Sequence, residues 1–263
     1  MSLYLKDSLP KKEWSFEGVV PFQIQQQQAT QFFEKWLARR WFSPRSFNTQ
    51  SQLIVAKKIY LPYWVFQGKA SVVYHGRGGL RHHQTIRTSE GGQSQAKTQW
   101  RSITGRFQHG FKNIFICASK SYPSSLTAKM KPSQVDQIIP HADHYLSGAG
   151  VEPATLSLEN VWELAYSEIE SQLRTIAKEE IRDSYDEVEI SHLQGELDSV
   201  DFQPFLFPVW VAEYVYQGKA YLCFVNGETG SVFGKSPVSP IKIGTVVLIA
   251  GLCFWGVFSL FIC

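Results

Sequence analysis

Two stretches of the chain place apolar side chains at three- and four-residue steps, the spacing that gathers them on one face of a helix. The first runs from Ile24 to Trp41 and is followed by Ser43 and Pro44, which favour a helix end. Its apolar face comprises Ala29, Phe32, Phe33, Trp36 and Leu37. The second begins after Ser157, a good N-cap residue, and keeps its period for about six turns. Its face comprises Val161, Trp162, Ala165, Ile169, Leu173, Ile176, Ala177 and Ile181.

Runs rich in β-branched and aromatic residues predict the strands. The first run, 53–66, precedes Gln67 and Gly68, which predict a tight turn into a returning strand, 69–75. Polar residues and glycines dominate 76–99, a stretch that fits either polar hairpin strands or a loop. Residues 121–155 contain four prolines and are predicted to be mostly loop. Further strands are predicted at 113–118, 205–216, 219–225 and 231–234.

The two halves of the chain contain similar strings. Residues 60–70 read YLPYWVFQGKA, and residues 207–211 read FPVWV, followed by YQGKA at 216–220. Each string follows a predicted helix, so the similarity reflects either a duplication or a chance likeness of aromatic strands. A proline lacks the N–H that a neighbouring strand needs, which favours a sheet edge, a strand start or a bulge at each Pro-x-Trp. Trp64 and Trp210 are expected to anchor the core by packing.

These elements predict an α+β fold class: two related helix-plus-antiparallel-β units packed together, followed by one C-terminal transmembrane helix. The expected boundaries are a polar N-terminal arm at 1–18, a first α+β half at 19–155, a second α+β half at 156–236, a linker at 237–242 and a transmembrane helix at 243–263.

The predicted membrane helix follows Lys242, beyond which no residue is charged. Residues 243–263 would form a helix of about 32 Å, close to the roughly 30 Å thickness of the hydrocarbon core. The alternative is a buried core helix. Lys235 and Lys242 precede the apolar run, and the positive-inside rule then puts the N-terminal domain on the cytoplasmic side. The sequence therefore predicts a single-pass, tail-anchored membrane protein that contacts the lipid bilayer through 243–263.

Composition narrows the possible functions. Of the 263 residues, 44% are hydrophobic and 14% aromatic, which fits a globular protein with a sizeable core. The net charge of +3 is too small to favour a nucleic-acid partner. None of the 4 cysteines, at positions 117, 223, 253 and 263, forms a CxxC pair. We therefore expect no disulfide framework and a reducing compartment, and residues 1–12 lack the apolar core of a signal peptide.

Candidate reactive groups are few. His141 and His144 flank Asp143 in a loop and are the candidate metal ligands, but a zinc site needs three or four convergent ligands, and His75 or His109 would have to supply the rest. No GxSxG elbow, P-loop or dinucleotide fingerprint is present, and Cys117 is expected to be a buried strand residue. The sequence thus predicts no catalytic residue and no cofactor.

The most basic stretch is 74–107, where arginines alternate with aromatic residues. Arg77, Arg81, Arg87 and Arg101 are the candidates for contact with an anionic surface, either lipid headgroups or an acidic partner. A solvated loop face is the alternative explanation of the same residues.

A family resemblance rests on a series of strings along 19–263. They are WLARRWFSP, YLPYW, WRSITG, FICAS, IIPHADHYLSGAGVEPATLSLE and VNGETGSVFG, ahead of the apolar C-terminal run. In this order they resemble bacterial TFIIB-type zinc-ribbon-containing membrane proteins, sometimes given primosomal-helicase names although no helicase motif is present. That family usually begins with a Cys-rich ribbon, and residues 1–18 contain no cysteine, so a zinc-dependent role is not carried over. The resemblance also implies association with membrane-organising proteins of the flotillin-like class.

The sequence thus predicts a non-catalytic scaffold or recruitment module for partner proteins. Two alternatives stay open at this point. One is a membrane-bound metal-dependent enzyme that uses the His141–His144 loop, and the other is a module that binds lipid headgroups or a small ligand through 74–107.

Overall fold

The computed structural model describes residues 2–5, 15–41, 43–44, 52–88, 91–242, 244–245 and 251. The chain divides into two compact units, each built from three segments. Unit 1 comprises Met1–Ser15, Tyr63–Ala118 and Thr155–Pro204. Unit 2 comprises Phe16–Pro62, Ser119–Ala154 and Phe205–Cys263. The segments interleave because two long strands, β3 (Gln52–Thr88) and β7 (Glu187–Tyr216), each begin in one unit and end in the other.

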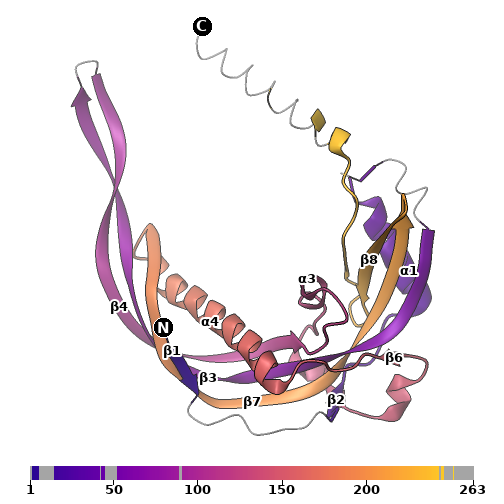
Figure 1. The fold of residues 1–263 in the computed structure, drawn as a ribbon. Helices are drawn as coiled ribbons and strands as arrows, with labels where there is room; N and C mark the ends of the chain where they lie inside the picture. Colours follow the sequence, from indigo (N-terminus) through magenta and orange to yellow (C-terminus); the bar gives the residue numbers. More distant parts are fainter. Residues whose placement is uncertain are drawn as a thin grey trace. The chain divides into compact units, whose positions relative to one another are not determined.

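Unit 1 is an antiparallel ribbon with a helix on one face. β3 pairs with β4 (Gly91–Cys117) from Tyr63↔Cys117 to Thr88↔Gly91, and the sheet order runs β4-β3-β7. The short β1 (Ser2–Leu5) runs parallel to β7. The helix α4 (Leu158–Arg182) packs against β4, and Figure 1 shows the β3–β4 ribbon continuing past the end of α4 and the start of β7. Part of this ribbon therefore has no third strand or helix beside it among the described residues.

The helix α4 matches the predicted pattern. The Ser157 hydroxyl caps it by accepting a hydrogen bond from the backbone N–H of Asn160 at 3.4 Å. Its buried face repeats at three- and four-residue steps and consists of Val161, Ala165, Ile169, Leu173, Ala177 and Ile181. The predicted second helix is therefore confirmed, with its apolar face against the ribbon.

The polar, glycine-rich stretch after residue 75 forms hairpin strands, one of the two readings left open by the sequence. At several glycines of the ribbon a neighbouring group comes too close for a side chain. A Cβ on Gly78 would lie 2.4 Å from the ring of Tyr185, and one on Gly105 would lie 2.2 Å from the Tyr74 hydroxyl. The missing side chains of Gly78 and Gly105 therefore leave room for aromatic rings to pack against the ribbon.

Unit 2 packs a helix and short strands around the second half of β7. The helix α1 (Gln26–Ala38) contacts β8 (Lys219–Asn226) and β9 (Val232–Gly234), and β8 pairs with β7 and β9. Two smaller pairings flank them: β2 (Gly18–Val19) with β5 (Ile139–Pro140) and β7, and β6 (Gly150–Val151) with β3. The short helices are α3 (Ser124–Thr127), η1 (Val135–Gln137) and η2 (Asp143–Leu146).

Trp64 and Trp210 both lie in cores. Trp64, in unit 1, is 0% exposed and packs edge-on against Phe202 with ring centroids 5.5 Å apart. Trp210, in unit 2, is 6% exposed and donates its indole N–H to the Ile24 carbonyl at 2.9 Å. Each indole thus sits among apolar neighbours of its own unit.

The predicted fold class is wrong. The strands of the described residues form one nine-stranded mixed sheet, and β1–β7, β2–β7 and β3–β6 are parallel pairs. The prediction of two helix-plus-antiparallel-β units failed because it treated each aromatic string as a separate local hairpin. In the structure, residues 60–70 form one continuous piece of β3 that crosses from unit 2 into unit 1, whereas residues 207–211 lie in the part of β7 that belongs to unit 2.

The two Gln-Gly-Lys-Ala strings show why. Gln217 and Gly218 form a turn with φ values of 50° and 73°, as predicted. The predicted turn at Gln67–Gly68 is wrong, because these residues continue β3 with a register shift between Phe66 and Gly68. A Cβ on Gly68 would lie 2.8 Å from the Phe111 ring, so this glycine serves close packing and not chain reversal. The same string has two structural roles, decided by its neighbours.

The prediction of a membrane protein also needs correction. Most of the predicted transmembrane helix at 243–263 lies outside the described residues, which include only Gly244, Thr245 and Gly251 of it. No helix in the described residues is both long and apolar enough to cross a bilayer. The longest, α4, carries charged residues along its length. The single-pass, tail-anchored topology, with the N-terminal domain on the cytoplasmic side, is therefore contradicted for the described chain. The prediction rested on the length and lack of charge of 243–263, most of which the structure does not describe.

Candidate functional site

The predicted histidine loop lies in unit 2. The backbone N–H of His141 donates to the Glu17 carbonyl at 3.1 Å, and its Nε2 atom is buried with no hydrogen-bond partner among the described residues. His144, in η2, is exposed and packs against the Tyr145 ring at 3.9 Å between centroids. Within the described chain, no three His, Cys, Asp or Glu side chains converge to hold a metal ion. His75 and His109, the other suggested ligands, belong to unit 1.

The thiol of Cys223 is unsuited to nucleophilic chemistry. It is fully buried in the core of unit 2, and burial raises its pKa to about 12, although the Arg40 guanidinium acts in the opposite direction. The reactive form of a cysteine is the thiolate. At neutral pH this group is therefore a neutral core side chain.

Two of the four predicted arginines are held in ion pairs on the face of the ribbon opposite α4. Arg77 donates from Nε to Glu189 at 2.7 Å, and its guanidinium lies 4.5 Å from the centre of the Trp100 ring. The hydrogen bond to Glu189 raises the pKa of Arg77. Arg81 donates from Nε to Glu187 at 2.8 Å. Carboxylates of β7 therefore already neutralise Arg77 and Arg81 of β3.

The other two predicted arginines differ from this pair. The Arg87 side chain lies outside the part of the chain that the structure describes in detail. Arg101, on β4, is exposed, and no ion pair involves it among the described residues. The structure thus divides the predicted arginines into Arg77 and Arg81 on β3, which are in ion pairs, and Arg101 on β4, which has no described carboxylate partner.

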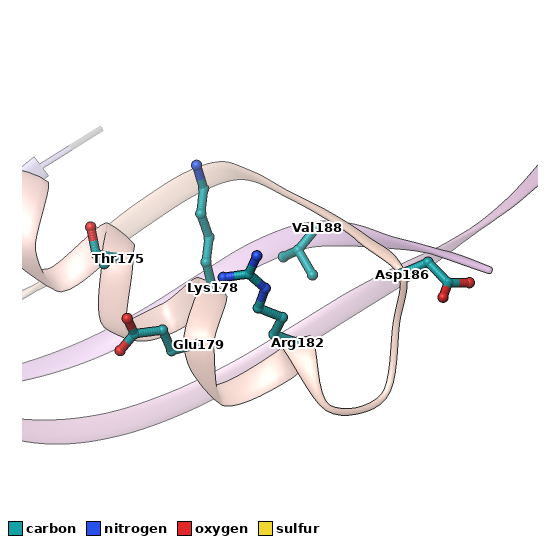
Figure 2. Close-up of a pocket in the computed structure, with 6 residues that line it drawn as sticks. All are labelled: Thr175, Lys178, Glu179, Arg182, Asp186 and Val188. Atoms are coloured by element: carbon teal, nitrogen blue, oxygen red, sulfur yellow. The ribbon is translucent and has the colours of Figure 1, made fainter. Parts of the chain in front are cut away.

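A pocket of about 300 Å³ lies between the end of α4 and the start of β7. Figure 2 shows six residues that line it: Thr175, Lys178, Glu179, Arg182, Asp186 and Val188. The four helical residues are spaced so that they share one face of α4. Two cationic and two anionic side chains border the space, and in Figure 2 the Asp186 carboxylate points away from Arg182. This balance of charge favours neither an anion nor a cation, so the pocket has no clear ligand chemistry.

The outer edge of β4 is the most distinctive chemical feature of unit 1. β4 ends the sheet order, and on its outer side no strand of the described residues pairs with it. The strand contains no Asp or Glu from residue 91 to residue 117. Four exposed cations follow it, and we call them the basic edge: Lys97, Arg101, Arg106 and Lys112.

The cations of the basic edge have no carboxylate partner among the described residues. The sequence pattern identified Arg101 as a candidate, but it could not separate Arg101 from the paired arginines of β3. The signal available in the sequence was the absence of acidic residues along 91–117. Because the sequence left 76–99 undecided between strands and a loop, it could not show that these cations lie on the edge strand of a sheet.

Comparisons with known proteins add one relative. No family model matches the chain, and no solved structure matches it. The chain is similar to the uncharacterized protein YdjG of Bacillus subtilis (strain 168), with 25% identity over 225 residues. The match covers 86% of this chain and 64% of that protein, so the chain spans less than two thirds of the relative's length.

Proposed function

We propose that this chain is a non-catalytic recruitment module that binds partner proteins through the basic edge of β4. The observation that carries the proposal is the outer edge of β4 along residues 97–112, which pairs with no strand of the described residues and carries four exposed cations. An open strand edge presents backbone N–H and C=O groups to a partner, and unpaired surface charges steer the encounter. The edge thus offers both hydrogen-bonding groups and a charge signature.

The distribution of charge in unit 1 supports this role. Among the described residues, Glu187 and Glu189 of β7 pair with Arg81 and Arg77 of β3, and Glu180 of α4 forms a hydrogen bond with Tyr74 of β3. A partner that contacted Arg77 and Arg81 of β3 would meet guanidinium groups that are already paired with carboxylates. A partner that approaches from β4 would meet Lys97, Arg101 and Arg106 without competition from a described carboxylate.

A comparative capture experiment tests the proposal. The full chain serves as bait in extracts of cells that produce it naturally, alongside two charge-reversal variants of equal net charge. The edge variant replaces each residue of the basic edge by Glu. The control variant replaces four other exposed cations by Glu: Lys131, Lys178, Arg182 and Lys219. Circular dichroism and Tm would verify that both variants fold.

The expected result is a partner protein held at a fixed ratio by the wild-type chain and by the control variant, and lost from the edge variant. Retention of that partner by the edge variant would overturn the proposal. Loss from both variants would overturn it too, because binding would then depend on net charge and not on the edge. A wild-type bait that holds no protein at a fixed ratio would also contradict it.

A further inference from the structure

The β3–β4 pairing fixes which side chains of β4 share a face. The register runs from Gly68↔Phe111 to Thr88↔Gly91 without a shift. Successive side chains of a strand alternate between faces, so Lys97 and Arg101 lie on one face and Arg106 lies on the other. Lys97 and Arg101 share their face with Gly105, which lies opposite Tyr74 in the register. The cations of the basic edge are therefore divided between both faces of the ribbon.

This division decides what kind of partner fits. A flat polyanion, such as a nucleic acid or a charged surface, contacts one face at a time. The spacing is also wide, since four or five residues of a strand span about 13–17 Å. Duplex DNA carries one charge per roughly 1.7 Å of its axis. Sparse cations on alternate faces do not match such a charge density.

An added β-strand reaches both faces at once. Its side chains lie directly beside those of the edge strand, about 4.5–5.5 Å apart, and opposite charges there form favourable cross-strand pairs. Carboxylates opposite Lys97 and Arg101 would lie on one face, and a carboxylate opposite Arg106 on the other. We propose that the partner of the basic edge is an acidic, extended protein segment that adds to β4 as a further strand. This inference rests on the proposed recruitment function.

The exposed fractions of the β4 side chains specify the rest of the segment. Ile103 and Phe107 are half-buried on the face that carries Arg101, whereas Ser102 and Thr104 on the other face are exposed. The segment should therefore place apolar residues beside Ile103 and Phe107, small polar residues beside Ser102 and Thr104, and carboxylates beside the cations. Strand addition of this kind takes its affinity from main-chain hydrogen bonds and its specificity from alternate side chains.

Synthetic peptides test the inference directly. The first probe is Val-Glu-Val-Thr-Val-Thr-Glu-Thr-Thr-Thr-Glu, written for antiparallel pairing from Phe107 to Lys97, and the second reverses this order for parallel pairing. The controls are a scrambled peptide of the same composition and a peptide with N-methyl groups that block alternate backbone N–H donors. Fluorescence anisotropy would report the binding of each labelled peptide to the full-length chain.

One probe should bind saturably, and the scrambled and N-methylated controls should bind more weakly by roughly tenfold or more, since each cross-strand pair contributes a few-fold. Arg101→Glu combined with Arg106→Glu should weaken the probe by about the same factor. Lys178→Glu with Arg182→Glu should leave it unchanged. Bound probe should slow amide hydrogen exchange along residues 97–107.

Equal binding of the probe and the scrambled peptide would overturn the inference, because it would show charge attraction without strand addition. Failure of both probes to bind would overturn it as well. Neither result would touch the recruitment function if the edge variant still loses its partner in the capture experiment. Conversely, a partner that survives reversal of the basic edge would refute the recruitment function whatever the peptides do.

Discussion

Gly195 gives the sharpest test of how β3 and β7 pack in unit 1. A Cβ added at this position would lie 2.2 Å from the Ser71 carbonyl oxygen and 3.0 Å from the Val72 Cα. Both are backbone atoms of β3, so no side-chain rotation can relieve the clash. Gly195→Ala should therefore force the two strands apart. Overpacking of this kind costs about 1–3 kcal/mol of unfolding free energy.

A matched control is available on the same ribbon. A Cβ on Gly110 would have its nearest neighbour at 3.8 Å, an ordinary contact, and neither glycine has a positive φ. Gly110→Ala should be neutral or stabilise by about 0.4–1 kcal/mol, because alanine restricts the unfolded chain. Gly76→Ala approaches the same boundary from β3, since its Cβ would lie 2.3 Å from the Glu189 carbonyl oxygen, and should behave like Gly195→Ala.

Thermal and urea unfolding of the three variants, followed by tryptophan fluorescence, would measure these differences. For a chain of this size, 1 kcal/mol corresponds to roughly 2–4 °C in Tm. We expect Gly195→Ala and Gly76→Ala to lower the Tm and Gly110→Ala to leave it unchanged or raise it. Equal stability of Gly195→Ala and Gly110→Ala would refute the close approach of β7 to β3, and with it the sheet order in unit 1.

Three further perturbations test separate parts of the structure. Removing Arg81 and Glu187 singly and together in a double-mutant cycle should give a coupling of only about 0.2–1 kcal/mol, because both side chains are partly exposed; a coupling several times larger would contradict that exposure. Burial raises the pKa of Cys223, from 9.0, and of Tyr60, from 10.0, to about 12 each, so the unfolded chain loses these protons first and stability should fall as the pH rises from 9.0 toward about 12. Near-ultraviolet titration and denaturation across that range would show it, and constant stability would refute the burial of both groups. Asn226 is 3% exposed and its side chain binds three backbone groups, so Asn226→Ala should cost about 1–3 kcal/mol in urea unfolding, and a neutral result would show that these hydrogen bonds are absent.

The sequence predicted best where a local pattern decides the structure. The α4 helix followed from the spacing of Val161, Ala165 and Ile169 and from the Ser157 cap, all within one segment. The turn at Gln217–Gly218 likewise depends only on backbone conformations that these two residues tolerate. Such features need no distant partner.

Where a distant neighbour decides the structure, the sequence was insufficient. Gln67–Gly68 carries the same turn signal as Gln217–Gly218, yet Gly68 continues a strand because the Phe111 ring packs against it. The sequence could not decide between strands and a loop for the ribbon, because its glycines pack against distant residues. Gly78 lies against the Tyr185 ring, and Gly105 lies against Tyr74 on the partner strand. No local periodicity records these contacts.

The candidate site was predictable only in part for the same reason. Arg77 and Arg101 look alike in the sequence, and only the position of β7 separates the arginine bound to Glu189 from the arginine on the basic edge. The prediction from 74–107 therefore included Arg101 of the basic edge, but it could not select the cations that remain without a described carboxylate partner.

Site-specific photo-crosslinking in cells that produce the protein would test the central claim most directly. A photoreactive side chain would replace Gln99 or Gln108, two exposed residues on opposite faces of β4, or Glu179, an exposed residue on α4. Our account predicts that the positions on β4 crosslink to the same partner protein and that Glu179 does not. Crosslinking of a partner from Glu179 but from neither position on β4 would contradict recruitment through the basic edge.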